Sequence, residues 1–291
     1  MSNTSQIIAE RSRDIGDFLV GRLLPFRKKR MVGPFIFIDH MGPSEIGPDK
    51  YMDIGQHPHI GLSTLTYLFE GEMMHKDSIG SHQRITPGSV NWMTAGKGVV
   101  HTERTPVDHR DGKTRSVHGF QIWVALPKHL EMMEPEFFHI QQQNLPTWRV
   151  GSLNFTLVAG EAFGEKSPVP VYSPLFMVEV KCSGDASFDL NGAANGEVGV
   201  CVVEGSVTAC GETIEAGNML VSKIDDSCKL HIHKDSHLLL FGGEPFSEER
   251  FINWNFVATS KERLEEAREQ WRNGEFELIE GEGPMIPLPR G

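Results

Sequence analysis

Short runs in which apolar and polar residues alternate recur along the whole chain, and glycine, proline, asparagine or aspartate separates them. Alternation of this kind is typical of a β-strand with one buried face, and the separating residues favour tight turns. In the first half we expect strands at residues 35–38, 62–69, 90–93 and 120–126. In the second half we expect strands at residues 175–180, 198–203, 206–208, 218–222, 228–233 and 238–241. The pattern predicts an all-β protein.

One segment near the end of the sequence departs from this pattern and predicts a helix. Residues 259–262 (TSKE) fit a capping box that starts at the threonine. Leu264, Ala267 and Trp271 follow at helical spacing, and a glycine then provides a stop. We therefore expect a short helix over residues 259–273.

The organisation along the chain favours two domains. A length of 291 residues fits two domains or one large one, at roughly 150 residues per domain. Each half contains an apolar strand that ends at a Glu-Gly turn, at Gly71 and at Gly205, although hairpins can resemble one another by chance. The alternation breaks near residues 141–148. We expect an N-terminal domain over residues 1–142 and a C-terminal domain, with the helix, over residues 143–291.

Composition and charge narrow the class of protein. Hydrophobic residues make up 39% and charged residues 23%, which excludes disorder, collagen and coiled coil for the bulk of the chain. The net charge of −11 repels phosphate backbones, so we expect no direct nucleic-acid partner. No stretch has the ~18 apolar residues of a membrane span, and residues 1–10 lack an apolar signal core, so we expect a cytoplasmic protein with no membrane partner. Reduced, buried thiols are expected at Cys182, Cys201, Cys210 and Cys228.

Histidines are concentrated in the first half, where ten of the thirteen lie within the first 150 residues. The sequence His57-Pro58-His59 is followed about forty residues later by His101 and Glu103. Residues two apart on an extended strand point to the same face, so each pair offers two ligands to one side. Two such strands packed together could place four ligands around one ion, a donor set that suits Fe, Mn, Ni, Cu or Zn. The alternative is a set of hydrogen-bonded or surface histidines.

The residues around these histidines resemble the cupin pattern and, more narrowly, the pirin family. The matching stretches cover most of residues 20–127 in the family's order, and they are residues 39–43 (DHMGP), 57–61 (HPHIG), 66–71 (TYLFEG), 75–78 (HKDS), 92–103 (WMTAGKGVVHTE) and 121–127 (QIWVALP). The second half is matched more weakly, through residues 241–245 (FGGEP) and the terminal helix. The resemblance implies a bicupin, with two face-to-face antiparallel β-barrels of jelly-roll type and one metal in the N-terminal barrel.

The resemblance assigns the metal ligands to His57, His59, His101 and Glu103. General cupins place a glutamate a few residues after the first histidine pair, where this chain has serine and threonine; Glu103 supplies the carboxylate instead, as in pirins. We expect one divalent ion per chain, Fe(II) in the first place, with Ni, Mn, Cu, Co and Zn as alternatives. Other histidines of this half are candidates for contacts near the site or for structural roles, namely His40, His75, His82, His109 and His118.

The second half lacks the corresponding ligands. Counting back from its Glu-Gly turn by the spacing found in the first half leads to Asn191 and Ala193, which cannot form the same site. Counting forward from its second glycine turn leads to Leu230. The nearby His231 and His233 have no partner carboxylate in place, and we interpret them as part of an ordinary strand. The C-terminal barrel is therefore expected to hold no metal.

The resemblance implies an oxidoreductase similar to quercetin 2,3-dioxygenase. A four-ligand site leaves positions of an octahedral ion open, which would allow a flavonol-like aromatic substrate and O2 to bind side by side. We expect Glu103 to be the catalytic base toward the substrate hydroxyl as well as a ligand. The alternative is a non-catalytic, metal-containing regulatory protein that binds a protein partner, which eukaryotic pirins resemble.

Overall fold

The computed structural model describes residues 6–15, 19–48, 50–190, 195–209, 211–223 and 229–289. Its contacts divide the chain into two compact units. The N-terminal unit takes the described residues of the ranges 13–20, 39–139 and 247–291, and the C-terminal unit takes those of 1–12, 21–38 and 140–246. These units cut the chain at other places than a single boundary after residue 142, because each end of the chain groups with the opposite half.

Two sheets form the N-terminal unit. Several strands of its larger sheet contain residues of both units. The larger sheet has the order β12-β9-β6-β11-β4-β3-β2, and the smaller has the order β5-β10-β7-β8. The strands of the larger sheet are β2 (Arg11–Asp14), β3 (Leu19–Leu24), β4 (Phe35–Ile46), β6 (Leu62–Glu70), β9 (Val90–Thr94), β11 (Arg115–Ala125) and β12 (Glu136–Ile140). Those of the smaller sheet are β5 (Asp53–His59), β7 (Met73–Asp77), β8 (His82–Ile85) and β10 (Val99–Arg104). A separate hairpin is made by β24 (Phe251–Asn253) and β25 (Phe256–Ala258).

The C-terminal unit also contains two sheets. An eight-stranded sheet has the order β1-β21-β18-β23-β16-β14-β13, with β15 paired to β14, and a four-stranded sheet has the order β17-β22-β19-β20. The strands of the larger sheet are β1 (Gln6–Ala9), β13 (Thr147–Val150), β14 (Leu153–Ala162), β15 (Glu165–Lys166), β16 (Leu175–Cys182), β18 (Glu197–Glu204), β21 (Asn218–Lys223) and β23 (His237–Gly243). Those of the smaller are β17 (Ala186–Phe188), β19 (Ser206–Ala209), β20 (Glu212–Glu215) and β22 (Leu230–Ile232). Three short 3-10 helices are η1 (Val107–His109), η2 (Lys128–Leu130) and η3 (Gln142–Asn144).

The prediction of an all-β protein is confirmed, and each expected strand is present with somewhat different ends. The sheets are open and do not close into barrels. In the C-terminal unit, alternate residues of β16 such as Phe176 and Val178 face an apolar core that also contains Val207 and Ile232 from the smaller sheet. This alternation is the physical basis of the sequence pattern, because successive side chains of a strand point to opposite faces.

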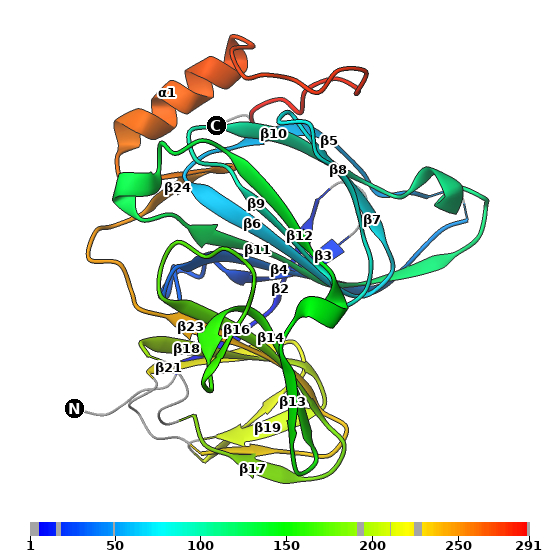
Figure 1. Cartoon of the computed structure of the whole chain (residues 1–291), viewed down its shortest axis with the longest axis vertical. Coiled ribbons are helices and arrows are strands. Elements are labelled where there is room, and N and C mark those ends of the chain that lie inside the picture. The colour runs from blue at the N-terminus through cyan, green and yellow to red at the C-terminus, as the bar shows by residue number, and fades with distance from the viewer. Residues whose placement is uncertain are drawn as a thin grey trace. The chain divides into compact units, whose positions relative to one another are not determined.

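The predicted helix is present as α1 (Lys261–Arg272), the orange helix of Figure 1. Its N-cap is Ser260, whose Oγ accepts a hydrogen bond from the backbone N–H of Arg263 at 3.1 Å. The predicted capping box began one residue too early, because the Thr259 hydroxyl donates instead to Glu131 at 3.0 Å. The apolar stripe predicted for this helix is confirmed by Leu264, Ala267 and Trp271, which pack with Ile60, Val100 and Phe256 of the N-terminal unit.

Residues 275–289 form a C-terminal strap that runs against strand β5. The Gln56 Oε1 accepts the backbone N–H of Ile279 at 2.8 Å, and its amide nitrogen donates to the carbonyl of Gly283 at 2.6 Å. The backbone N–H of Ile286 donates to the carbonyl of Gln56 at 2.8 Å. In Figure 1 the red strap accordingly lies beside β5 and β10. The strap therefore supports a strand that carries two of the predicted ligands.

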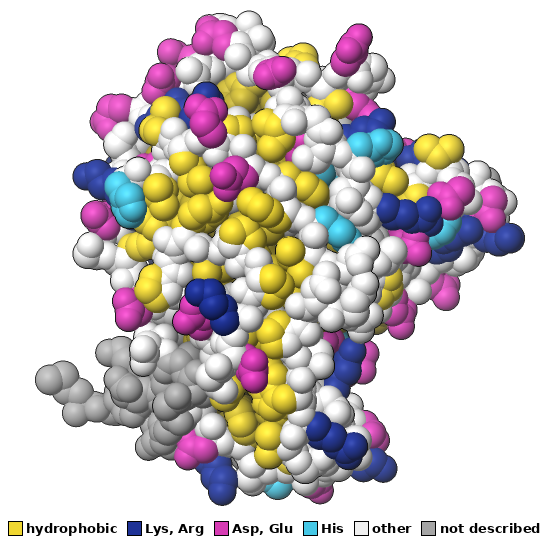
Figure 2. Space-filling view, viewed as in Figure 1, with side chains coloured by type: hydrophobic (Ala, Val, Ile, Leu, Met, Phe, Trp, Pro, Cys, Tyr) yellow, Lys and Arg dark blue, Asp and Glu magenta, His cyan; other side chains and the backbone are white. Residues whose placement is uncertain are grey.

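Charged side chains of both signs mix on the surface of the N-terminal unit. Arg84 pairs with Asp108 at 3.0 Å, and Arg110 pairs with Asp53. Figure 2 shows the same mixture of dark-blue and magenta side chains along the right-hand edge of its upper part. These cations are thus neutralised by neighbouring carboxylates.

The two described cysteines, Cys182 and Cys201, are buried and free, as expected. Cys210 and Cys228 lie outside the described residues. Across the described ranges, none of the helices has both the length and the hydropathy needed to cross a bilayer.

A buried ion pair lies in the larger sheet of the C-terminal unit. The Glu179 carboxylate of β16 lies 2.8 Å from His237 Nε2 of β23 and 3.0 Å from Lys181 Nζ. Burial alone would raise the pKa of Glu179, but His237 and Lys181 together lower it to about 2, from an ordinary value of 4.5. A carboxyl group whose pKa is lowered by folding stabilises the fold above its unfolded pKa, and the contribution is lost as the pH falls.

We expect the Glu179→Gln substitution to remove a stabilisation on the order of 3 kcal/mol at neutral pH. Between pH 4.5 and pH 2 the difference from wild type should shrink, because the carboxyl group of the unfolded chain takes up a proton in this range before that of the folded protein does. Urea unfolding midpoints at pH 7 and pH 3 measure this. The matched control is Glu161→Gln, whose carboxylate pairs with Lys166 at the surface. Equal acid sensitivity in the two variants would contradict the assignment.

Candidate metal centre

Strands β5 and β10 lie side by side and bring the three predicted histidine ligands together. The antiparallel register places His101 opposite His57, and His59 lies opposite Val99. Because His57 and His59 are two residues apart on β5, both reach the same side of the sheet. The three side chains are buried, with His101 wholly enclosed. The sequence motif therefore folds into one compact cluster.

Glycines allow the ends of these strands to approach their neighbours closely. Gly61 follows His59 with a φ of +67°, and a Cβ at this position would lie 2.0 Å from the carbonyl oxygen of Val257. Gly96 has a φ of +50°, and a Cβ there would lie 2.1 Å from the carbonyl of Met133. Both conformations favour glycine, and side chains would collide with backbone. The glycines of the two motifs thus hold both strand ends in place.

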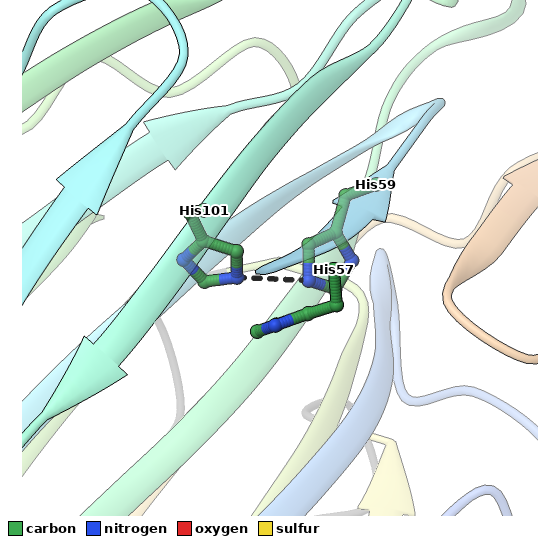
Figure 3. A group of neighbouring side chains, drawn as sticks. All are labelled: His57, His59 and His101. Atoms are coloured by element: carbon green, nitrogen blue, oxygen red, sulfur yellow. Dashed lines mark hydrogen bonds between the residues drawn. The ribbon is translucent and has the colours of Figure 1, made fainter. Parts of the chain in front are cut away.

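The imidazole rings turn nitrogen atoms toward a common point. One nitrogen from each of His57, His59 and His101 lies within 4.8 Å of the other two. The Nε2 atoms of His59 and His101 are 3.1 Å apart, and the ring centres of His57 and His101 are 4.2 Å apart. Figure 3 shows the three rings converging from two neighbouring strands. Such convergence of nitrogen lone pairs is what a metal ion requires.

Backbone carbonyls fix the proton positions on two of these rings. His57 Nδ1 lies 2.8 Å from the carbonyl oxygen of Gly55, and His59 Nδ1 lies 3.2 Å from that of Asn255. A carbonyl can only accept, so each Nδ1 carries the hydrogen and each Nε2 keeps its lone pair. His101 Nδ1 instead lies 3.4 Å from the Nδ1 of His75. Hydrogen bonds of this kind orient metal-ligating histidines in proteins.

Burial also keeps the three imidazoles neutral. It lowers the pKa of His57 to about 4 and holds the pKa of His59 and His101 well below the ordinary value of 6.5. The neighbouring imidazoles lower these values further, because two adjacent positive charges repel one another. At neutral pH all three rings are therefore uncharged and can act as ligands.

Glu103, the fourth predicted ligand, lies on β10 but outside this group of nitrogens. The register of β10 against β5 shifts between His101 and Glu103, so simple alternation does not hold there. Its buried Oε1 accepts a hydrogen bond from the Gln121 amide at 3.0 Å, and the Gln121 Oε1 accepts one from the Thr66 hydroxyl at 2.7 Å. Burial raises the pKa of Glu103 to about 7, against the opposing effect of Gln121. A cation nearby would favour the carboxylate.

The remaining histidine candidates separate into two groups. His75 contacts the predicted ligand His101 and is therefore part of the candidate site. His40 and His118 face each other at 2.9 Å between their Nε2 atoms, and His109 lies 2.9 Å from Arg84; none of these contacts involves a ligand. The exposed His82 lies on β8, two strands away from β10.

Two partners of the site carry no local sequence signal. Asn255 is 196 positions from His59 along the chain, and it contributes only its backbone carbonyl, so its side chain is uninformative. Gln121 belongs to the opposite sheet and reaches Glu103 across the space between the sheets. Either contact becomes visible only when the two sheets are placed together.

The donor set fits a divalent transition metal. Three neutral imidazole nitrogens are the ligands preferred by Fe, Co, Ni, Cu and Zn, and the other nitrogen of each ring has a hydrogen-bond partner. In the C-terminal unit, Leu230 is buried in strand β22, while Asn191 and Ala193 lie outside the described residues. Within the described ranges, the cluster of β5 and β10 is the one group of this kind.

Comparison with known proteins covers both halves of the chain. The pirin family model matches residues 18–124, and the model of the pirin C-terminal cupin domain matches residues 177–277. A pirin-like protein of Caulobacter vibrioides is 45% identical over 283 residues, which cover 96% of this chain and 97% of that protein. The bicupin fold is thereby confirmed.

Solved structures agree with this assignment. A crystal structure of quercetin 2,3-dioxygenase from Acinetobacter baumannii is 38% identical, with a TM-score of 0.89, and the match covers 98% of this chain and 95% of that one. A bacterial pirin of Escherichia coli, solved in complex with nickel(II), shares the fold with a TM-score of 0.66 at 20% identity; the match covers 84% of this chain and 100% of that one. The sequence and structural matches together show that this chain belongs to the pirin family.

Proposed function

We propose that this chain is a metal-dependent dioxygenase that cleaves flavonols such as quercetin with O2, using one divalent ion, Fe(II), in the cytoplasm. The observation that carries the proposal is the convergence of the neutral nitrogens of His57, His59 and His101 inside the N-terminal unit. The similarity to a quercetin 2,3-dioxygenase structure over nearly the whole chain supports the same chemistry. A structural zinc ion is closed by four protein ligands in a tetrahedron, whereas an octahedral ion with the four predicted ligands would keep positions open for substrate and O2.

The residues of the site have different proposed roles. His57, His59 and His101 would hold the ion, which would supply Lewis acidity and one-electron chemistry toward O2. We assign to Glu103 the fourth ligand position and the role of base, accepting the proton of the substrate hydroxyl at its carboxylate. The Gln121 amide donates to this carboxylate, and the Thr66 hydroxyl holds the amide in that orientation.

Aromatic side chains pack against His59 and His75. Trp123 packs edge-on against His59, with ring centres 5.0 Å apart, and Phe137 stacks on His75 at 4.5 Å. An enclosed site of this kind strengthens the electrostatic effect of each charged group, because the local dielectric is low. It also favours an aromatic substrate over a strongly hydrated one.

We expect His57→Ala to lower the affinity for a divalent metal by more than about 100-fold. Loss of a group that only hydrogen-bonds to a metal ligand already costs about 10- to 100-fold, and loss of the ligand itself should cost more. Metal content after dialysis, measured by plasma mass spectrometry, should fall from one ion per chain to a small fraction. The matched control is His231→Ala, since His231 is exposed and bonds Ser187. Full metal content in His57→Ala would contradict the assignment of this site.

The substitution Glu103→Gln tests the base. We expect the metal to stay bound while kcat falls by at least about 100-fold, since general bases contribute on that scale. The amide cannot accept the substrate proton. Metal content and turnover must be measured on the same sample. Full turnover with metal bound would refute the role of Glu103.

The activity itself is tested with protein loaded anaerobically with Fe(II). On addition of quercetin and air, an oxygen electrode should record O2 uptake, with carbon monoxide released in equal amount. The His57→Ala protein treated in the same way is the control for uncatalysed oxidation. Absence of both signals with Fe, Ni, Co, Mn, Cu and Zn and with several flavonols would reject the dioxygenase and favour the regulatory protein that binds a protein partner.

A further inference from the structure

His75 and Asp77 form a buried pair directly behind the ligand His101. Both lie on β7, which pairs with β10 so that Asp77 is opposite His101. His75 Nε2 lies 3.0 Å from the Asp77 carboxylate, and His75 Nδ1 lies 3.4 Å from His101 Nδ1. Both side chains are 3% exposed. The three groups therefore form a continuous chain from a carboxylate to a ligand.

Hydrogen-bond partners determine the proton positions in this chain when its imidazoles are uncharged. The second oxygen of Asp77 accepts the backbone N–H of Ser81 at 2.8 Å, so the carboxylate accepts on both sides. Its partner His75 must then carry a hydrogen on Nε2, which leaves the Nδ1 of a neutral His75 as an acceptor. With this tautomer His101 donates from Nδ1, and its Nε2 lone pair faces the Nε2 lone pair of His59 at 3.1 Å, a contact between two acceptors that a cation bound to both nitrogens would relieve.

The hydrogen-bond partner of His101 differs from those of His57 and His59. His57 and His59 donate to neutral backbone carbonyls, whereas His101 is connected to a buried negative charge through a second imidazole. A carboxylate behind a ligating histidine raises the basicity of the ligand and fixes its tautomer. Phe137 stacks on the His75 ring at 4.5 Å and 20°, which restricts the ring to this orientation.

We propose that Asp77 and His75 are positioning residues that set the tautomer of His101 and strengthen it as a metal ligand. This inference rests on the proposed function, because it concerns the same metal centre. It adds a specific consequence: a carboxylate two side chains away determines which ring nitrogen of His101 carries the hydrogen. We call the hydrogen-bonded chain from Asp77 through His75 to His101 the relay. It acts in the metal-free protein as well, so it can be tested without turnover.

The substitution Asp77→Asn should invert the relay. An amide has one oxygen, and the Ser81 N–H requires it, so the NH2 group is turned toward His75 Nε2. His75 must then accept at Nε2 and donate from Nδ1, which forces the hydrogen of His101 onto Nε2. That hydrogen would block the nitrogen that faces the metal site.

The experiment uses the full chain with 15N-labelled histidine. In the metal-free wild type at pH 8, long-range 1H–15N correlation spectra should show His101 protonated at Nδ1; in Asp77→Asn they should show it protonated at Nε2. Calorimetric titration with Co(II) should give an affinity 10- to 100-fold weaker for the variant. The absorption bands of the Co(II) form should also shift.

The matched control is Glu282→Gln. Glu282 of the strap pairs with Lys76 of β7 and Arg104 of β10, so the variant removes one negative charge beside the same two strands without touching the relay. The Glu282→Gln protein should keep the wild-type tautomer of His101 and should bind Co(II) with an affinity within twofold of wild type. Thermal unfolding of each metal-free protein shows that the fold is intact.

Two results would overturn the inference: Nε2 protonation of His101 in the wild type, or an unchanged tautomer in Asp77→Asn. A Co(II) affinity within twofold of wild type would refute the strengthening of the ligand. If the wild type bound no Co(II), the proposed function would fail, while the tautomer measurement would still decide whether the relay exists. The wild-type spectrum also decides the matter if Asp77→Asn does not fold.

Discussion

The architecture of the site depends on keeping three uncharged imidazoles buried side by side. A buried polar group costs free energy unless it is hydrogen-bonded, and three adjacent rings would repel one another if protonated. The pairing of β5 with β10 brings the rings together. Acceptors behind each ring then take its Nδ1 hydrogen, which leaves the Nε2 lone pairs directed inward. The capacity to hold a metal ion is thus a consequence of the hydrogen bonds that the protein makes to the Nδ1 atom of each ring.

These acceptors come from widely separated parts of the chain. The carbonyl of Asn255 lies in the turn between β24 and β25, and the strap that follows α1 is bonded on both sides of the Gln56 amide. Residues 247–289 therefore complete a site whose predicted ligands all lie before residue 104. This requirement explains why the end of the chain groups with the N-terminal unit, although the sequence places it after the second set of strands.

The sequence predicts the local features well and the long-range ones poorly. Alternation located the strands, and the spacing of His57, His59 and His101 identified the cluster, because both depend on residues that are neighbours in the chain or on adjacent strands. The position of Glu103 could not be read from alternation, because a register shift separates it from His101. The role of His75 was also open, since it depends on the register of β7 against β10.

The boundaries of the units show the same limit. A break in alternation near residue 142 was visible, but the exchange of the chain ends between the units leaves no local pattern. The helix cap was misplaced by one residue because Thr259 and Ser260 are both good caps, and the choice is made by a contact of Thr259 with Glu131.

The two units use the space between their sheets in opposite ways. In the C-terminal unit that space is filled by apolar side chains, which contribute stability in proportion to the area buried. In the N-terminal unit part of it is occupied by imidazoles, a carboxyl group and the amide of Gln121, each with a hydrogen-bond partner. Such a network contributes little net stability, because its hydrogen bonds mainly offset the cost of removing polar groups from water. Its benefit is a fixed orientation of the ligands, and an apolar core elsewhere in the same chain allows the protein to maintain it.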